Sequence, residues 1–406
     1  PVVTTHQYHR ILGSCVAQTF DRGGHMIGTC VTPFGVNLVA RDPDTLEILA
    51  DQSITRWLPV GQKFSGGVYF HLDHEDKVLL ASNTLHIDRW SLEPTASGVE
   101  WQRIDSIPIG DILDEARRED HKVIDVMPDW QGNYWFITRA GLVGTVNADG
   151  TGGKAIPLQT ADATEGIDNA LAVGKNGIFI VSSHAMYSFK RSAQGGIELQ
   201  WREAYDRGSG PKEGTMGFGS GTTPTLVGND YVAITDNADG QIHVNVYAQQ
   251  KMAGEQLVCS QGVFPPDRGT SENSLAVVGK SLIVENNFGY SGPKNVPQSE
   301  PGIARVDILA QGCRLAWENL AIASPSAVPK VSLANGLIYL YTRDEANPDD
   351  LHAWYFTAIS AETGELVYKQ LTGVGWLFNN HYGSISISPE GAAYVGMMGG
   401  LVRIQD

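Results

Sequence analysis

The sequence predicts an all-β protein that forms a single eight-bladed β-propeller. A two-strand hairpin pattern recurs eight times at a spacing of about fifty residues, and most copies are followed by two further short strands. Four short antiparallel strands per repeat, separated by polar or glycine-containing turns, are typical of propeller blades. The eight copies begin at these residues: Val16, Val68, Val123, Asn169, Thr223, Ser271, Lys330 and Ser384.

The copy at Ser271–Tyr290, SENSLAVVGKSLIVENNFGY, shows how the hairpins place their polar ends. Two apolar strands flank a turn at Gly279–Lys280, and carboxylate and amide residues stand at the outer ends of both strands. In an antiparallel pair joined by a tight turn, the start of the first strand lies beside the end of the second. We therefore expect five polar residues to lie together: Glu272, Asn273, Glu285, Asn286 and Asn287.

The last repeat predicts how the ring closes. The copy from Ser384 to Ile404 supplies only three strands, whereas His6–Ser14 precedes the first hairpin and has no copy of its own. A ring that completes its last blade with the N-terminal strand has no open sheet edge. Because a blade cannot bury both faces until its neighbours stack on it, we expect residues 1–406 to form one domain. Seven blades is the alternative if the copy at Val68 is irregular.

Charge and hydropathy limit the classes of partner. The chain has 29 Lys and Arg against 45 Asp and Glu, which gives a formal net charge of −16. This charge argues against nucleic acid and anionic membranes as partners. No apolar run approaches the roughly eighteen to twenty residues of a membrane-spanning helix, so membrane insertion is not expected. The sequence leaves the oligomeric state open.

Four cysteines allow three pairings, and one pair is favoured by the hairpin pattern. Cys15 and Cys30 flank the first hairpin turn symmetrically, so they should face each other and form a disulfide. Cys259 and Cys313 fall on the expected fourth strands of consecutive blades, where outer edges diverge, and their pairing stays open. An even number of cysteines in an acidic all-β chain favours a secreted or periplasmic location.

Several stretches resemble the repeats of the quinoprotein-like (PQQ-repeat) β-propeller superfamily. They are the hairpins SLAVVGKSLIVENN and TPTLVGNDYVAITDN, together with DPDTLEILA and SAETGELVYKQLTG, which correspond to the phrases that join strands three and four in that superfamily. The chain also resembles uncharacterised bacterial secreted proteins with PQQ-like repeats. The resemblance implies a propeller fold. It does not imply PQQ as cofactor, because this chain has no adjacent cysteine pair and its nine tryptophans occupy no fixed repeat position.

Polar residues gather at one end of the predicted ring. The connection into strand one and the turn from strand two to strand three lie on the same face of a propeller, around the axial channel, where binding sites are favoured. We expect eight residues there to contact a ligand: Asn169, Asn237, Asn273, Asn287, Tyr290, Asn380, His381 and Tyr382. The structural alternative is that Asn and Asp at strand ends form Asx-turns, and that each histidine is an ordinary core or rim residue.

The same face offers candidates for catalysis and for a metal. Oxygen ligands from Glu272, Glu285, Asn286 and Asp236 would suit a hard divalent cation such as Ca²⁺. A transition metal on His71, His121, His184 and His381, which come from four repeats, is the competing possibility.

The candidate catalytic groups are Lys330, His184 and Glu272. The expected function is binding of a small polar ligand at the channel mouth, with a metal-assisted hydrolase or lyase as its catalytic form. The alternatives are a non-catalytic binding module or a protein-interaction scaffold, and a PQQ-dependent dehydrogenase is less favoured.

Overall fold

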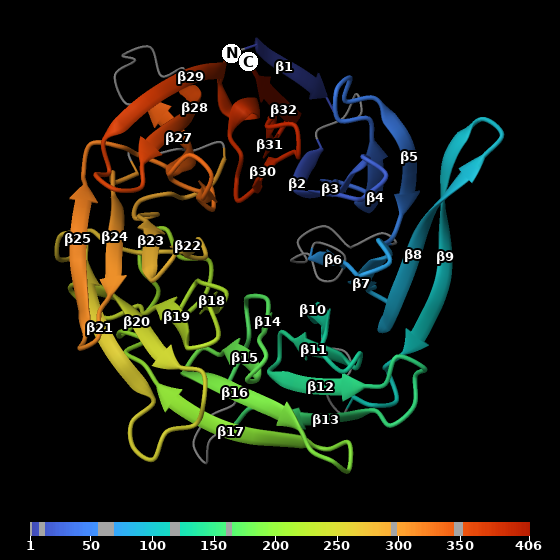
Figure 1. The fold of residues 1–406 in the computed structure, drawn as a ribbon, viewed down its shortest axis with the longest axis horizontal. Helices are drawn as coiled ribbons and strands as arrows, with labels where there is room; N and C mark the ends of the chain where they lie inside the picture. Colours follow the sequence, from blue (N-terminus) through green and yellow to red (C-terminus); the bar gives the residue numbers. More distant parts are fainter. Residues whose placement is uncertain are drawn as a thin grey trace.

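The computed structural model describes residues 2–7, 13–55, 69–113, 122–159, 165–293, 299–344 and 352–406. Within these ranges the chain forms eight four-stranded antiparallel sheets. The sheets are arranged as blades around a central axis, with the first strand of each blade innermost (Figure 1). The predicted eight-bladed propeller is therefore confirmed.

The first four blades follow the chain in simple order, each with strands one to four from the axis outward. Blade one comprises β2 (Ser14–Phe20), β3 (Met26–Thr32), β4 (Gly35–Arg41) and β5 (Ile48–Ser53). Blade two comprises β6 (Phe70–Leu72), β7 (Val78–Ala81), β8 (His86–Thr95) and β9 (Gly98–Pro108). Blade three comprises β10 (Val123–Pro128), β11 (Tyr134–Thr138), β12 (Leu142–Val146) and β13 (Lys154–Pro157). Blade four comprises β14 (Ala172–Val173), β15 (Ile178–Val181), β16 (Ala185–Arg191) and β17 (Ile197–Ala204).

The next three blades repeat this order, and the eighth takes its outer strand from the N-terminus. Blade five comprises β18 (Thr225–Val227), β19 (Tyr231–Thr235), β20 (Ile242–Ala248) and β21 (Leu257–Val263). Blade six comprises β22 (Ala276–Val278), β23 (Ser281–Glu285), β24 (Ile303–Ile308) and β25 (Cys313–Asn319). Blade seven comprises β26 (Lys330–Ser332), β27 (Leu337–Asp344), β28 (Ala353–Ser360) and β29 (Leu366–Val374). Blade eight comprises β30 (Ile385–Ile387), β31 (Ala393–Met397), β32 (Gly400–Gln405) and β1 (Val2–Gln7).

Closure through the N-terminus is confirmed, but the closing strand β1 is Val2–Gln7 and shares only His6 and Gln7 with the expected segment His6–Ser14, whose last residue begins β2. Strand β1 pairs antiparallel with β32, in a register that runs from Val2 opposite Gln405 to Gln7 opposite Gly400. The two termini consequently lie side by side in Figure 1. Blade two is complete even though β6 has only three residues, since β6 pairs with β7. Val68, where that repeat was expected to begin, lies outside the described residues.

Removal of residues 1–13 is expected to lower the melting temperature and to promote association through the exposed edge of β32. The deletion removes the six register pairs between β1 and β32 and opens the last blade to solvent. Differential scanning calorimetry with light scattering checks this, and an unchanged melting temperature would contradict it.

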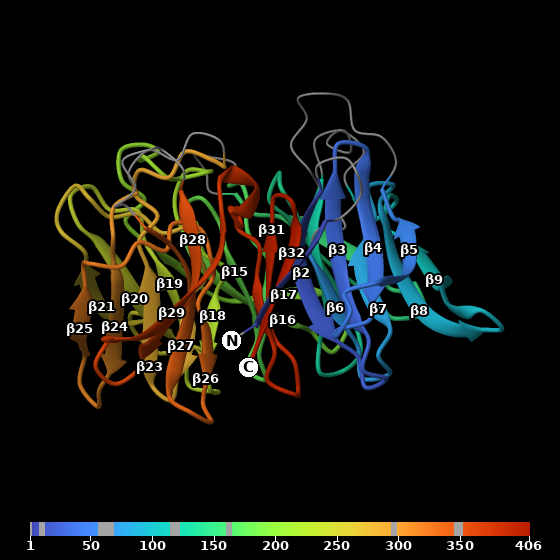
Figure 2. The same cartoon turned by 90° about the horizontal axis from the view of Figure 1, so that it is seen from above.

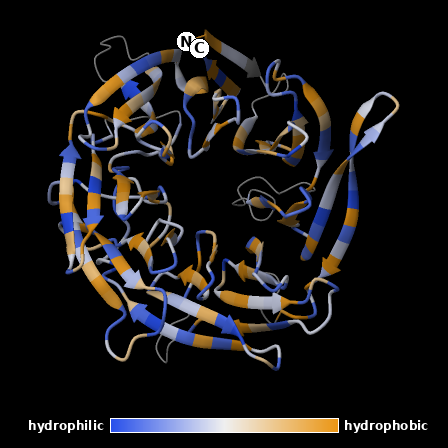
Figure 3. Ribbon diagram, in the orientation of Figure 1, coloured by the Kyte–Doolittle hydropathy of each residue, from blue (hydrophilic) through white to orange (hydrophobic). Residues whose placement is uncertain are grey.

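The core lies between neighbouring blades. Apolar side chains of adjacent sheets form separate clusters around the ring, for example Phe179 with Ile234 between blades four and five, and Ile283 with Leu340 between blades six and seven. The second strand of a blade is covered on both faces, so β23 is buried throughout. The outermost strand has one exposed face, so burial alternates along β5. Figure 3 shows the same contrast between apolar inner strands and mixed outer strands.

Both disulfides are present. Cys15 and Cys30 face each other in β2 and β3 with a Cα–Cα distance of 3.9 Å, which confirms the predicted pair. Cys259 of β21 and Cys313 of β25 are also bonded, with a Cα–Cα distance of 5.7 Å. The second bond links the outer strands of blades five and six.

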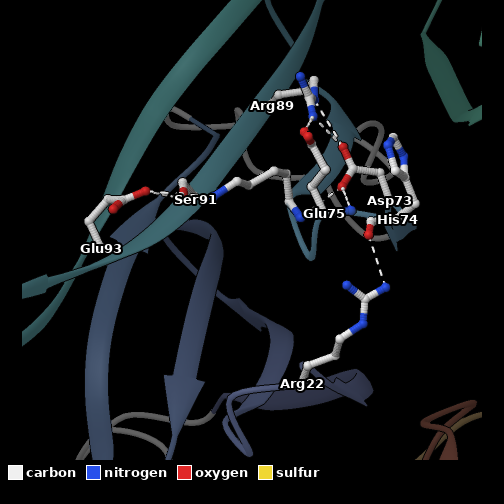
Figure 4. Close-up of polar contacts among 8 residues, drawn as sticks. Arg22, Asp73, His74, Glu75, Arg89, Ser91 and Glu93 are labelled. Atoms are coloured by element: carbon white, nitrogen blue, oxygen red, sulfur yellow. Dashed lines mark hydrogen bonds and ion pairs between the residues drawn. The ribbon is translucent and has the colours of Figure 1, made fainter.

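A charged network joins blades one and two at the ends of their first hairpins (Figure 4). Arg89 Nη2 lies 2.5 Å from Asp73 Oδ2 and 3.2 Å from Glu75 Oε2. Arg22 from blade one donates to the carbonyl oxygen of His74 over 2.9 Å. These contacts hold the short first hairpin of blade two against its neighbour. The β8–β9 hairpin of blade two projects outward past the rim of the ring (Figures 1 and 2).

Candidate functional site

One end of the ring carries the segments that enter strand one and the turns between strands two and three. The 3-10 helix η2 (Trp376–Phe378), which leads into blade eight, lies at the upper edge of the ring in Figure 2 and marks this end. All the predicted site residues belong to these segments or to the adjoining strand ends.

The rim asparagines of blade six tie it to the loop that enters blade seven. The backbone N–H of Glu272 donates to Asn287 Oδ1 over 2.6 Å, and Asn287 Nδ2 donates to the carbonyl oxygen of Pro325 over 2.6 Å. Asn273 Nδ2 donates to the carbonyl oxygen of Ala327 over 3.1 Å. Asn273 and Asn287 are therefore buried inter-blade contacts. Both side chains connect segments at the rim of the ring. The expectation that they contact a ligand stays a prediction.

Glu285 is a buried carboxyl enclosed by protein donors. Ser324 Oγ lies 2.6 Å from its Oε1, and Asn273 Nδ2 donates to Oε2 over 2.7 Å. Burial raises the pKa of Glu285 to about 8, against the opposite effect of the bonds from Ser324 and Asn273. The side chain is therefore neutral at pH 7. Its proton can be donated to Ser324 Oγ, which in turn lies 3.2 Å from the carbonyl oxygen of Tyr341.

Asp236, Asn237 and Asn286 make local rim contacts. Asp236 Oδ2 lies 3.0 Å from His243 Nδ1, and Asn237 Nδ2 donates to the carbonyl oxygen of Arg207 over 3.0 Å. Asn286 Oδ1 accepts from the N–H of Phe288 over 3.1 Å, which is an Asx-turn. The structural alternative considered for strand-end residues therefore describes Asn286 well.

The entry to blade eight is strained and meets blade six. His381 and Tyr382 have φ values of 40° and 66°, and two consecutive non-glycine residues in the left-handed region are costly. The hydroxyl of Tyr290 donates to Asn379 Oδ1 over 3.1 Å and lies 2.9 Å from His381 Nδ1. When the hydroxyl proton is directed to Asn379 Oδ1, the neutral His381 ring carries its proton on Nδ1 and leaves Nε2 as an acceptor. Burial lowers the pKa of His381, which keeps the ring neutral.

The aromatic rings at this corner contact one another. Tyr290 packs edge-on against Tyr382 with ring centres 5.7 Å apart, and His381 lies 5.4 Å from Tyr382. Asn380 supports the turn beneath them, since its Nδ2 donates to the carbonyl oxygens of Ser326 (3.2 Å) and Gly383 (3.0 Å). Tyr290, His381 and Tyr382 thus form a cluster of mutually inclined rings, and Asn380 supports the turn that carries two of them.

His184 lies at the exit of strand two in blade four. Its Nε2 accepts from Arg207 Nη1, and its Nδ1 lies 2.9 Å from Ser183 Oγ. Burial and the neighbouring charge of Arg207 lower the pKa of His184, so the ring is neutral. The Arg207 guanidinium stacks on Phe218, with its central carbon 3.7 Å from the ring centre. This cation was not among the residues expected from the sequence.

Lys330 and Asn169 stand at the start of inner strands. Lys330 is the first residue of β26 and its side chain reaches solvent. Even so, the protein around it lowers its pKa through loss of hydration. Asn169 is largely buried three residues before β14.

Five side chains at this end pair with one another or influence one another's ionisation, and we call them the mouth cluster: Tyr69, Arg139, Asp168, Glu272 and Tyr382. Tyr69 of blade two is 38% exposed, yet its hydroxyl is enclosed enough that loss of hydration, with the charges of Asp125 and Glu272, raises its pKa to about 12 against the effect of Arg139. Burial first, and then the charge of Glu272, raises the pKa of Tyr382 in blade eight. One carboxylate of blade six therefore acts on hydroxyls from blades two and eight.

A glycine-rich loop over residues 205–224 borders the mouth cluster. Met216 N–H donates to Glu272 Oε1 over 2.9 Å. Gly217 packs against Asp168 so closely that a Cβ at this position would stand 2.6 Å from Oδ2. Asp168 also pairs with Arg139. The loop therefore spans from the blade-four side of the cluster to the blade-six side, and its glycine allows the close approach.

The four predicted metal ligands have separate protein partners in the contacts described above. Within the described ranges, no three His, Cys, Asp or Glu side chains gather as a set of metal ligands. Of the alternative histidine set, His71 lies 3.0 Å from Asp125, whereas His121 lies outside the described residues. In the described part of the chain no helix has the length and apolar character needed to cross a membrane.

No family model matches the chain. An uncharacterized protein of Archaeoglobus fulgidus is 24% identical over 318 residues, which are 70% of this chain and 61% of that protein. The match thus spans about three-fifths of the archaeal relative. The resemblance to quinoprotein-like repeats stays an inference from the sequence.

Among solved structures, Saccharomyces cerevisiae Sqt1 is similar, with a TM-score of 0.59 and 10% identity over 98% of this chain and 97% of that chain. A streptogramin B lyase has a TM-score of 0.44 and 12% identity over 85% of this chain and 94% of that chain. The likeness to Sqt1 shows the propeller fold alone.

Proposed function

We propose that the protein binds a small polar ligand at the mouth cluster. The observation that carries this proposal is that the loop over residues 205–224 holds Glu272 of blade six through Met216 N–H and packs against Asp168, which pairs with Arg139. The charge of Glu272 also contributes to raising the pKa of Tyr69 and of Tyr382, so groups from blades two, six and eight share one electrostatic environment. They combine an acceptor, two aromatic faces and the Arg139–Asp168 ion pair, which are the polar and flat contacts of a small-molecule site.

Two further features support a ligand site here. Backbone strain such as that of His381 and Tyr382 tends to persist where the surrounding structure holds a functional geometry. The unprotonated Nε2 of His381 can accept a hydrogen bond from a ligand hydroxyl, because Nδ1 is committed to Tyr290.

The catalytic form of the proposal is a metal-assisted hydrolase or lyase. Lys330 has a lowered pKa, as a general base near neutral pH requires. A cation such as Ca²⁺ would be held by Glu272 with oxygens of the ligand and of water, because Glu285 is enclosed by Ser324 and Asn273. Two disulfides support an extracytoplasmic location as part of this proposal.

A thermal-shift panel tests the proposal with neutral sugars, amino acids, hydroxy acids and CaCl₂ as probes. At about one hundred times its Kd, a ligand should raise the melting temperature by roughly 3 °C for a chain of this size. The shift should be lost in Glu272→Gln, which keeps the acceptor for Met216 N–H but removes the charge. Any compound that stabilises the protein is then assayed for conversion, which Lys330→Met should abolish.

The matched control is Glu213→Gln, an exposed carboxylate on the same glycine-rich loop. It should leave every shift unchanged. Equal shifts in wild type and Glu272→Gln would contradict the proposal. The scaffold alternative would then rest on the exposed apolar side chains of the outer strand β29: Leu366, Val367, Tyr368, Leu371 and Val374.

A further inference from the structure

A pocket lies between blades three and four, at the end of the ring opposite the mouth cluster. These two blades occupy the lower part of Figure 1. The pocket has a volume of about 630 Å³ and is formed by turns that join strands one to two and strands three to four. In an antiparallel blade these turns lie at the other ends of the strands from the mouth cluster, so the two sites are separate. The volume falls within the range of small-molecule sites.

The pocket is cationic although the protein is strongly acidic. Three cationic side chains line it: Lys175, Lys190 and Arg191. The carboxylate in its lining, Asp129, already accepts hydrogen bonds from Asn133 Nδ2 (3.0 Å) and from the indole N–H of Trp135 (3.0 Å). The surplus of positive charge is therefore available to an anionic ligand.

Trp130 gives the pocket a flat apolar face. Its side chain is 67% exposed at the tip of the turn between β10 and β11, which is unusual for a large aromatic residue. Lys175 Nζ lies 5.9 Å from the centre of the Trp130 ring. An anionic group on a ligand stacked near this indole would thus meet a cation directly.

Hydrogen-bonding groups complete the lining. Gln131, Asn147 and Ser192 offer amide and hydroxyl groups. Arg191 is half-buried, and its guanidinium is held in place because Nη1 donates to Asn133 Oδ1. A guanidinium that is held in place and still partly exposed is a strong contact for a carboxylate.

We propose that this pocket binds an acidic oligosaccharide fragment of two or three sugar units. The C–H face of a pyranose ring can pack on the exposed indole of Trp130, which removes apolar surface from water. Sugar hydroxyls find partners in the amides of Gln131 and Asn147, and sugar carboxylates are neutralised by Lys175, Lys190 and Arg191. This site is independent of the proposed function at the mouth cluster.

Isothermal titration calorimetry of the full chain with sodium trigalacturonate tests the inference, with galactotriose, citrate and AMP as comparison probes. Trigalacturonate should bind most tightly, and more weakly as NaCl is raised. Trp130→Ala should weaken its binding about tenfold. The double change Lys175→Gln with Lys190→Gln should weaken binding and reduce its dependence on salt. Lys154→Gln, an exposed lysine on β13 outside the pocket, should bind as wild type.

Other outcomes overturn the inference. If galactotriose bound as tightly as trigalacturonate, the cationic side chains would not contribute to recognition. If citrate bound as tightly as trigalacturonate, the sugar rings would not contribute. Tighter binding of AMP would assign the pocket to nucleotides. Unchanged trigalacturonate binding by Trp130→Ala, or no binding by wild type, would remove the site.

Discussion

Glu285→Gln is expected to make the protein more stable than wild type above about pH 5, with a difference that grows up to about pH 8. The pKa of Glu285 is raised from 4.5 to about 8 by burial, so between these values the folded state holds a proton that the unfolded state has released. The free energy of unfolding of wild type therefore falls by about 1.4 kcal/mol for each pH unit in this window. Below the window both states are protonated, and above it both are ionised.

Glutamine reproduces the protonated carboxyl without a titratable group. Its Nε2–H can donate to Ser324 Oγ, which passes its own proton to the carbonyl oxygen of Tyr341, while Oε1 accepts from Asn273. Urea unfolding of both proteins from pH 4 to pH 9 checks the expectation. Parallel stability curves for wild type and variant would show that Glu285 is ionised in the folded state.

Glu165→Gln is the matched control because Glu165 is also buried but is held ionised. Although burial acts to raise its pKa, bonds from Ser182, Tyr187 and Arg202 lower it below the usual value. Its contribution to stability is present above the unfolded pKa and is lost as pH falls through the folded pKa. Glu165→Gln should therefore destabilise the protein near neutral pH, which is the opposite sign.

Replacing Cys259 and Cys313 with serine is expected to lower stability by about 4 kcal/mol, from the chain-entropy estimate for their sequence separation of 54 residues. For a chain of this size that is a fall in melting temperature of roughly 5 °C. Both sites are only half-buried, so serine fits without a large packing defect. Calorimetry of the double variant, with thiol titration of unreduced wild type, checks both the bond and its effect.

The pair Cys15 and Cys30 provides the comparison. Its separation of 15 residues gives a smaller estimate of about 3 kcal/mol. If the double variant at Cys259 and Cys313 had the same melting temperature as wild type, the stability of blades five and six would not depend on this disulfide.

The fold could be predicted because its signal is local and repeated. Strand two of each blade is covered on both sides, so a run such as Leu282–Val284 is recognisable as apolar in sequence. The pairing of Cys15 with Cys30 also follows from one hairpin. The pairing of Cys259 with Cys313 stayed open because it depends on the angle between two blades, which a repeat pattern does not contain.

For the candidate site, the sequence could predict only which residues of the same hairpin lie close together. The expected proximity of the polar ends in blade six is confirmed by the contacts of Asn273 with Glu285 and of Glu272 with Asn287. Their other partners, such as Pro325, come from the entry loop of the next blade, whose path depends on ring closure. The sequence therefore could not separate buried inter-blade contacts from side chains that face the axis.

Residues that act across the ring were missed for the same reason. Tyr69 lies just before β6, in the repeat whose regularity the sequence left open, and the effect of Glu272 on its pKa crosses the ring from blade six to blade two. Trp130 could have been found, since a tryptophan within the polar turn Asp129–Asn133 is a local signal of an exposed aromatic.

Crystallographic soaking with a set of small polar fragments tests the central claim most directly, because it reports where ligands lie. The account predicts fragments at the mouth cluster, between the rings of Tyr69 and Tyr382 and hydrogen-bonded to Glu272. Soaks in which fragments bind elsewhere on the protein, while the mouth cluster holds only water, would contradict it.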